Sequence, residues 1–234
     1  MSGTLYGVGV GPGDPELMTL KAHRLISTAR IVAYPAPDDG QSFARAIAAQ
    51  VIAPDAEEIA IVVPMKVERF PACEVYDEAA ERIAARLDEG EDVVVLCEGD
   101  PFFYGSFMYL YERLSDRFPS EIIPGVSSIM SCAAVLKRPL AARNETLSVI
   151  PGPISEDLLR QRLERTEAAA IIKVGRHLPK IKRALEALGL TDHAGYIERA
   201  SLPEQVVLPL SQAPETAPYF SMVLVYKGQE KWAL

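Results

Sequence analysis

The 234-residue sequence has few cysteines, few histidines and no long apolar run. Its three cysteines, Cys73, Cys97 and Cys132, are widely spaced and form no CxxC pair, so a disulfide framework and a zinc ribbon are both disfavoured. The three histidines have no HExxH or HxH spacing, and we therefore expect no metal site. Histidines this scattered also give no basis for a Ser-His-Asp triad.

Signals for membranes and secretion are missing as well. No apolar run approaches the roughly 18 residues that a membrane-spanning helix needs, and the N-terminus lacks the basic and apolar regions of a secretory signal. The formal net charge of −8 has the wrong sign for a protein that binds a nucleic-acid duplex or an anionic membrane. Hydrophobic residues make up 49% and charged residues 24% of the chain, as in ordinary globular proteins. We expect a cytoplasmic globular protein that binds neither nucleic acid nor membrane.

The first half of the chain alternates short apolar segments with helical patterns. Strands are predicted over 4–10, 30–35, 58–64 and 92–100, and helices over 17–29, 42–52, 73–90 and 107–114. Strands that are apolar throughout and separated by helices indicate a parallel sheet with helices on both faces.

The second half has a different pattern. Its last two predicted strands, 204–210 and 219–227, follow each other with no long helix between them. We expect these strands to pair antiparallel, which makes the second sheet mixed. The predicted fold class is therefore α/β with two α/β domains. An N-terminal domain over 1–118 has a parallel sheet, and a C-terminal domain over 119–234 has a mixed sheet.

Three loops rich in glycine and proline each follow a predicted strand and precede a predicted helix: 7–15, 98–105 and 123–128. The first lacks the glycine spacing of a Rossmann fingerprint, because the third glycine position falls on Asp14 or Pro12, and it has no Gly-Lys-Ser/Thr of a P-loop. NAD and ATP are therefore disfavoured. Ligands of open α/β sheets bind outside the carboxyl ends of strands, so the loops are candidates for a binding site.

Each loop alone also has a purely structural explanation. The first could be a tight turn between strand and helix, and Asp100, Ser127 or Ser128 could cap the helices that follow the other two. Basic residues cluster locally in this acidic chain and leave two alternatives open, a solvated helix face or a site for a carboxylate-rich small molecule. They are Lys173, Arg176, His177, Lys180, Lys182 and Arg183, with Arg138 and Arg143 as a second group.

Taken together, the loops resemble the tetrapyrrole (corrin/porphyrin) methylase family. The matching segments are GVGVGPGDPELMTLKA (7–22), VVLCEGDPFFYGS (94–106), IPGVSSIMSCAA (123–134) and YFSMVLV (219–225), in the family's order. The segments CEGDPFFYGSFMYL and AYP (33–35) are similar to the branch that methylates C-20 of precorrin-2 in cobalamin biosynthesis. The resemblance implies a homodimer, a ligand cleft between the two domains and a fold that is not Rossmann. It also implies S-adenosylmethionine (SAM) as methyl donor, a tetrapyrrole as substrate and S-adenosylhomocysteine as product.

The resemblance also implies which residues contact SAM and the tetrapyrrole. The SAM contacts are Val10, Pro12, Gly99, Asp100, Phe103, Ser127, Ser128, Val174 and Ala200. Gly13 and Asp14 are expected on the tetrapyrrole side, and Arg138, Arg176 and His177 are hypothesised to pair with its acetate and propionate groups. No catalytic residue is assigned, since Glu98, Asp14, Tyr104 and Glu198 are candidate proton acceptors by position only.

Three alternatives to this function stay open. The substrate could be the cobalt-loaded tetrapyrrole instead of the metal-free one. A more distant relative is diphthine synthase, which acts on a modified histidine of a protein. The third alternative is a non-catalytic tetrapyrrole-binding protein of the same fold, which a test of SAM binding distinguishes.

Overall fold

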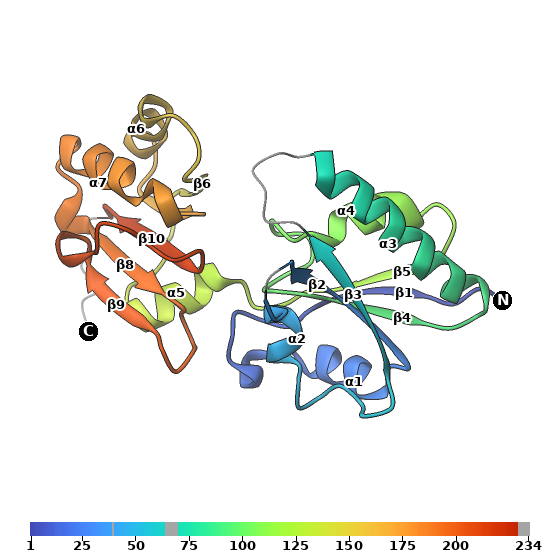
Figure 1. The fold of residues 1–234 in the computed structure, drawn as a ribbon. Coiled ribbons are helices and arrows are strands. Elements are labelled where there is room, and N and C mark those ends of the chain that lie inside the picture. Colours follow the sequence, from blue (N-terminus) through green and yellow to red (C-terminus); the bar gives the residue numbers. More distant parts are fainter. Residues whose placement is uncertain (39, 64–69, 229–234) are drawn as a thin grey trace. The chain divides into compact units, whose positions relative to one another are not determined.

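The computed structural model describes residues 1–38, 40–63 and 70–228 (Figure 1). The chain divides into two compact units, Met1–Ser127 and Ser128–Leu234. The boundary expected at 118/119 lies inside the first of these units. The reason is β5 (Ser120–Ile123), which pairs with β1 (Leu5–Gly9) and so belongs to the first sheet.

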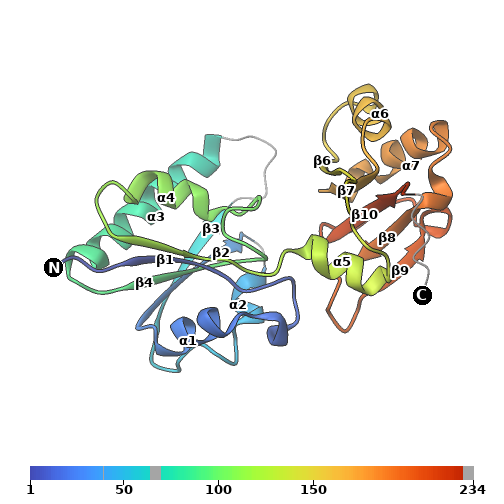
Figure 2. The same ribbon diagram turned by 180° about the vertical axis from the view of Figure 1, so that it is seen from behind.

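The first unit contains a five-stranded parallel sheet with the strand order β3-β2-β4-β1-β5. Its other strands are β2 (Ile31–Pro37), β3 (Glu57–Val63) and β4 (Val93–Cys97). Two helices, α1 (Leu20–Thr28) and α2 (Phe43–Ile47), cover one face, and α3 (Phe70–Asp88) and α4 (Phe107–Leu114) cover the other (Figures 1 and 2). The predicted parallel sheet with helices on both faces is confirmed.

The alternation of side chains along β4 explains why both faces need helices. Val93 and Val95 pack with α3 and α4, whereas Val94 and Leu96 pack with α1 and α2. All four side chains are buried, because successive residues of a strand point to opposite faces of the sheet.

Several elements of the first unit, α2 and β2 among them, differ in length from the prediction. The helix expected over 42–52 ends at Ile47. The strand expected over 30–35 continues through Pro35 to Pro37. Beyond Ala33, β2 pairs with β3 alone, so the missing N–H groups of the two prolines do not interrupt a ladder on both sides.

The second unit is built on a five-stranded mixed sheet with the order β6-β7-β10-β8-β9. Its elements are α5 (Ser128–Leu136), β6 (Leu147–Pro151), α6 (Glu156–Glu164), β7 (Ala168–Ile172), α7 (Leu178–Ala187), β8 (Ala194–Glu198), β9 (Val206–Pro209) and β10 (Ser221–Tyr226). β6 and β7 are parallel, whereas β10 is antiparallel to β7 and to β8. The predicted mixed sheet is confirmed.

The expected pairing of the last two strands is wrong. β9 pairs with β8, and β10 lies between β7 and β8. The burial of the two strands gives the physical reason. β10 is buried at every position except Tyr226, so it takes a central place covered on both faces, while the half-buried β9 forms the edge.

The second sheet also has helices on both faces. Residues of α6 and α7 pack on one face and residues of α5 on the other. Because β6, β7 and β8 run in the same direction, their carboxyl ends lie at one edge of the sheet. Within the described ranges, no helix is both long enough and apolar enough to cross a membrane.

Candidate functional site

The three glycine-containing loops of the first unit meet at the carboxyl ends of β4, β1 and β5, which are neighbours in the sheet. Gly11 and Gly99 form an isolated bridge, with N–H to carbonyl distances of 3.3 and 2.8 Å. A Cβ atom on Gly125 would lie 1.9 Å from the carbonyl oxygen of Gly99, and one on Gly9 would lie 2.7 Å from the Cα of Gly125. The backbones of the loops are in direct contact, and only glycine fits at these positions because any Cβ atom would clash.

Asp100 joins the second loop to the third. Its Oδ1 accepts a hydrogen bond from the N–H of Phe102 at 2.9 Å, and its Oδ2 accepts one from the N–H of Gly125 at 3.1 Å. The alternative in which Asp100 caps the next helix is not observed, because Ser106 is the N-cap of α4. The Asp100 carboxylate instead holds the two loops together.

The first loop continues β1 before the chain turns into a short helix. Val10 donates its N–H to the carbonyl of Cys97 at 2.9 Å. Val10, Pro12 and Gly13 are buried. Asp14 caps the 3-10 helix Pro15–Leu17, where its Oδ1 accepts the N–H of Glu16 at 2.9 Å.

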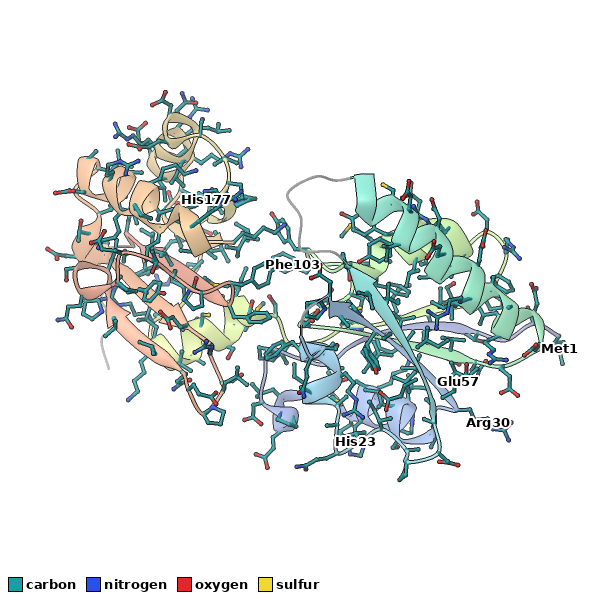
Figure 3. The ribbon with its side chains drawn as sticks, in the orientation of Figure 1. Met1, His23, Arg30, Glu57, Phe103 and His177 are labelled. Atoms are coloured by element: carbon teal, nitrogen blue, oxygen red, sulfur yellow. The ribbon has the colours of Figure 1, made fainter. Side chains whose placement is uncertain are left out.

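The second loop exposes three consecutive aromatic rings. Phe102, Phe103 and Tyr104 are 46%, 40% and 48% exposed, and Phe103 is labelled in Figure 3. Tyr104 has a left-handed backbone with φ of 57°. A Cβ on Gly105 would lie 2.5 Å from the carbonyl oxygen of Pro101, so the turn is tight. Exposed rings of this kind suit a flat ligand.

Glu98 directly precedes the glycine of the second loop. The alternation of β4 places Glu98 on the same face as Leu96, toward α1 and α2. Burial raises the pKa of Glu98, and backbone N–H groups, including that of Ala44 in α2, oppose the shift. Glu98 therefore keeps its proton to a higher pH than an exposed glutamate does.

The third loop leads out of the first unit. Ser127 is the last residue of that unit, and Ser128 is the first residue of α5 in the second. Val174 and Ala200 follow β7 and β8 at the carboxyl edge of the second sheet, and both are buried. Of the nine residues expected to contact SAM, six belong to the loops that meet in the first unit. They are Val10, Pro12, Gly99, Asp100, Phe103 and Ser127.

The second unit brings together two of the three basic residues hypothesised to bind the tetrapyrrole. Arg176 and His177 lie in the 3-10 helix Gly175–His177 that follows β7, and Figure 3 labels His177. Arg138 follows α5, whose Leu136 packs against Gly195 near the amino end of β8. Arg138 therefore lies at the opposite edge of the sheet from the other two.

Glu198 is engaged by a neighbour on its own strand. The hydroxyl of Tyr196 donates to its Oε1 at 2.5 Å. Burial and this hydrogen bond raise the pKa of Tyr196, so the tyrosine stays a donor.

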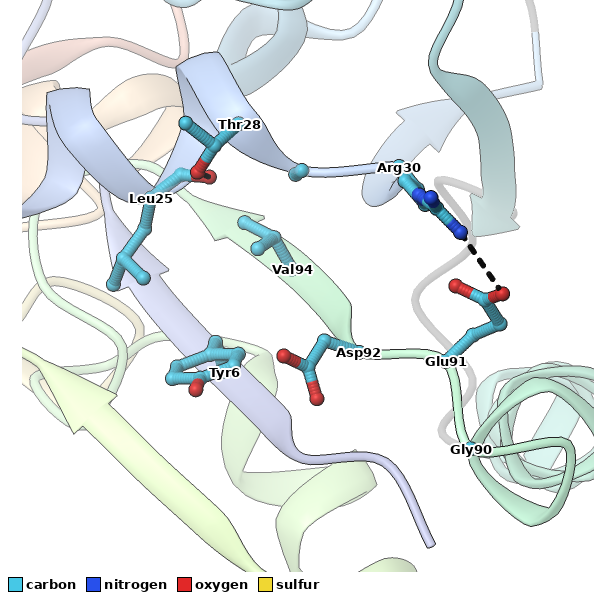
Figure 4. A pocket seen from close by; sticks show the side chains of 9 residues that line it. Tyr6, Leu25, Thr28, Arg30, Gly90, Glu91, Asp92 and Val94 are labelled. Atoms are coloured by element: carbon cyan, nitrogen blue, oxygen red, sulfur yellow. Dashed lines mark hydrogen bonds and ion pairs between the residues drawn. The ribbon is translucent and has the colours of Figure 1, made fainter.

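A separate pocket lies at the other end of the first sheet. It has a volume of about 310 Å³ and is lined by Tyr6, Leu25, Thr28, Ala29, Arg30, Gly90, Glu91, Asp92 and Val94 (Figure 4). Arg30 and Glu91 form an ion pair at 3.4 Å. Glu91 and Asp92 precede β4, so the pocket is at the amino ends of the strands and contains none of the expected site residues.

Comparison with known proteins identifies the chain. The model of the family described as Tetrapyrrole (Corrin/Porphyrin) Methylases matches residues 4–214. This chain belongs to that family. It is 43% identical over 232 residues to a precorrin-2 C(20)-methyltransferase from Sinorhizobium sp, with 95% of each chain covered. It is 31% identical over 234 residues to a cobalt-precorrin-2 C(20)-methyltransferase from Salmonella typhimurium, with 98% of this chain and 99% of that protein covered.

A solved structure of another tetrapyrrole methylase has the same fold. The uroporphyrin-III C-methyl transferase from Thermus thermophilus, crystallised with S-adenyl homocysteine, matches with a TM-score of 0.70 and 27% identity. The match covers 95% of this chain and 97% of that one. The predicted resemblance and the predicted fold class are both confirmed.

In this tetrapyrrole methylase, the loops of the first unit occupy a favourable place for a ligand. β1 leads to α1 on one face of the sheet, and the neighbouring β4 leads to α4 on the other. Ligands of open α/β sheets bind at such a point, where two neighbouring strands connect to helices on opposite faces of the sheet. The contact between Gly11 and Gly99 lies at this point.

Proposed function

We propose that this chain is a SAM-dependent C-methyltransferase that methylates C-20 of precorrin-2 in cobalamin biosynthesis and yields precorrin-3A and S-adenosylhomocysteine. The observation that carries the proposal is the 43% identity to a precorrin-2 C(20)-methyltransferase along 95% of both chains. The Thermus thermophilus relative, crystallised with S-adenyl homocysteine, supports SAM as the methyl donor.

The proposed SAM contacts come from both units. In the first unit they are Val10, Pro12, Gly99, Asp100, Phe103 and Ser127, and in the second they are Ser128, Val174 and Ala200. The loops of the first unit fit such a ligand, because their glycines leave the backbone accessible to close approach and the ring of Phe103 is exposed. Both carboxylate oxygens of Asp100 accept loop N–H groups, so Asp100 acts by holding the loops in place.

SAM supplies an electrophilic methyl group on a sulfonium, and C-20 of the reduced tetrapyrrole is an electron-rich meso carbon. The protein has to hold carbon, methyl and sulfur in line, an effect worth roughly 7–11 kcal/mol at best. Loops locked by backbone contacts suit this task, because they do not have to be ordered when the ligands bind. As the new C–C bond forms, the methyl–sulfur bond breaks, and the proton on C-20 then leaves.

Three of the four candidates for the group that takes this proton differ in their surroundings. Asp14 accepts a hydrogen bond from Glu16, and Glu198 accepts one from Tyr196. Backbone N–H groups donate to Glu98 as well, but burial outweighs them and raises its pKa, so its ionised form is a stronger base than an exposed carboxylate. We propose Glu98 as the first of these groups to replace in a search for the proton acceptor.

The proposed function is tested by one turnover with isotopically labelled SAM and precorrin-2, without oxygen and without cobalt. Mass spectrometry and NMR then locate the new methyl group, which is expected on C-20. If SAM binds but no methyl is transferred, cobalt-precorrin-2 is tried next, and transfer to it alone replaces the proposed substrate. If SAM does not bind, the methyltransferase proposal fails and the non-catalytic alternative takes its place.

We further propose that this chain is a homodimer, as the family resemblance implies, and that it is cytoplasmic. Size-exclusion chromatography with light scattering is expected to give a mass of twice the 25.6 kDa of the chain. A monomer at micromolar concentration would contradict the proposed dimer.

A further inference from the structure

Two basic residues at the edge of the second sheet have an unusual backbone conformation. Lys173 follows β7 with φ of 56°, and Arg199 follows β8 with φ of 46°. Both residues are exposed. A left-handed backbone is uncommon for residues other than glycine, because the Cβ atom approaches the following carbonyl oxygen. Strain of this kind is often kept where a side chain has a function.

The strand register places the two residues on either side of β10. β10 pairs with β7 and with β8, so the carboxyl ends of β7 and β8 flank the start of β10. The N–H of Arg199 donates to the carbonyl of Phe220 at 2.9 Å. Neighbouring strands lie about 4.8 Å apart, so the backbones of Lys173 and Arg199 are separated by about 10 Å, or two strand spacings.

Close packing holds Lys173 in place. The N–H of Gly152, which follows β6, donates to the carbonyl of Ile172 at 2.7 Å. A Cβ atom on Gly152 would lie 2.8 Å from the carbonyl oxygen of Lys173. The loop after β6 therefore leaves the backbone of Lys173 little freedom to relax.

Two exposed aromatic residues immediately precede β10, the strand that lies between β7 and β8. Tyr219 and Phe220 precede β10 and are 63% and 40% exposed. Their ring centroids are 5.1 Å apart in an edge-to-face arrangement. This edge of the second unit therefore combines two cations with exposed aromatic surface, which suits a flat ligand that carries carboxylates at its rim.

We propose that Lys173 and Arg199 bind the acetate and propionate carboxylates of the tetrapyrrole substrate, an inference that rests on the proposed function. Ammonium and guanidinium groups both form charge-assisted hydrogen bonds with carboxylates. Two cations separated by two strand spacings match a ligand with several carboxylates around its rim better than they match the single carboxylate of SAM. The nearest acidic side chain on β8, Glu198, is already engaged by Tyr196.

The test uses the full chain and the variants Lys173→Asn, Arg199→Asn and the double variant. Asparagine tolerates a left-handed backbone better than most residues, so it removes the charge with little added strain. The probe is sirohydrochlorin, the stable oxidised form of precorrin-2, whose binding is followed by fluorescence, and S-adenosylhomocysteine binding is measured by calorimetry. Each single variant is expected to bind sirohydrochlorin about tenfold more weakly, with S-adenosylhomocysteine binding unchanged.

Lys137→Asn provides a matched control. Lys137 is also exposed and left-handed, with φ of 55°, but it follows α5 at the other edge of the second sheet. Its replacement is expected to leave both affinities unchanged. Lys173→Arg and Arg199→Lys keep the charges and are expected to keep most of the sirohydrochlorin affinity, which guards against misfolding of the asparagine variants.

Three results would overturn the inference. Unchanged sirohydrochlorin binding in the double variant would show that the two charges do not contact the ligand. Loss of S-adenosylhomocysteine binding in the same variants would assign the charges to the methyl donor. An equal loss in Lys137→Asn would indicate a general effect of charge. Failure of the inference alone leaves methyl transfer to precorrin-2 by the unmodified chain intact, whereas failure of the proposed function abolishes that transfer, so the two failures are distinguishable.

Discussion

At the scale of single residues, Gly125 is the point at which the loop after β5 contacts the loops after β1 and β4. The Cβ of Gly125→Ala would lie 1.9 Å from the carbonyl oxygen of Gly99, so the loops have to move apart. We expect the free energy of unfolding to fall by roughly 1–3 kcal/mol and methyl transfer to slow by about 100-fold. Urea unfolding and single-turnover rates measure the two effects.

Gly189→Ala is the control for this substitution. Gly189 has φ of 66° but no atom within 4 Å of the added Cβ, so the variant tests backbone strain alone. It is expected to lose about 1 kcal/mol of stability and to keep the rate of methyl transfer. A Gly125→Ala enzyme that is as fast as the unmodified one would exclude the loop contact from the catalytic site.

Glu98 is expected to make stability depend on pH. Burial raises the pKa of Glu98 in the folded chain, whereas a glutamate in the unfolded chain has a pKa of about 4.3. Its stabilising contribution is therefore complete below the unfolded pKa and is lost as the pH rises through the higher folded pKa. Glu98→Gln cannot ionise, so its advantage in stability over the unmodified chain is expected to grow as the pH rises from about 4 to 8.

Urea unfolding across this pH range measures the effect of Glu98→Gln. Glu186→Gln, which replaces an exposed glutamate of α7, controls for the loss of one negative charge. A stability difference between Glu98→Gln and the unmodified chain that stays constant with pH would contradict the raised pKa of Glu98 in the folded chain.

At the scale of elements, the sequence predicts best where a segment's own pattern decides its structure. The helix predicted over 107–114 is α4 with the same bounds, and the order of strand, glycine loop and helix correctly predicts three loops at one end of a parallel sheet. The position of β10 between β7 and β8 could not be predicted, because strand partners distant in sequence leave no local signal. The left-handed backbones of Lys173 and Arg199 could not be predicted either, because residues other than glycine seldom adopt this conformation.

Asp100 connects the loop after β4 to the loop after β5, so substitution of Asp100 is expected to affect both loops. Both of its oxygens accept backbone N–H groups, one of them across 25 residues of chain from Gly125. Asp100→Asn replaces one acceptor by an N–H donor, and an N–H facing another N–H costs about 1–3 kcal/mol. We expect this loss of unfolding free energy together with weaker S-adenosylhomocysteine binding, as measured by urea unfolding and calorimetry.

Asp92→Asn is the matched control at the amino end of β4. Asp92 accepts one hydrogen bond, from the N–H of Thr4 at 2.7 Å, and the carbonyl oxygen of asparagine can replace that acceptor. Its stability is expected to stay within about 0.5 kcal/mol of the unmodified chain. Equal losses of unfolding free energy in Asp100→Asn and Asp92→Asn would show that the hydrogen bonds of Asp100 between the loops contribute no more to stability than the hydrogen bond of Asp92.

At the scale of the whole molecule, the proposed SAM contacts from both units predict where ligand binding slows hydrogen exchange. A ligand at 100 times its dissociation constant stabilises the folded state by about 2.7 kcal/mol. With S-adenosylhomocysteine, we expect slower exchange in the loops after β1 and β4 in the first unit, and in the loops after β7 and β8 in the second. Exchange measured by mass spectrometry resolves these four segments.

The pocket at the amino ends of the first sheet serves as the internal control. Its segments around Arg30 and Glu91 contain none of the proposed contacts, so their exchange is expected to change least. Protection confined to the first unit would remove Val174 and Ala200 from the proposed site. Protection centred on Arg30 and Glu91 would move the cofactor to the other end of the sheet. A bound ligand protects the segments that it contacts and those that are coupled to them, so slower exchange in the loops of both units would support a contribution of both to cofactor binding.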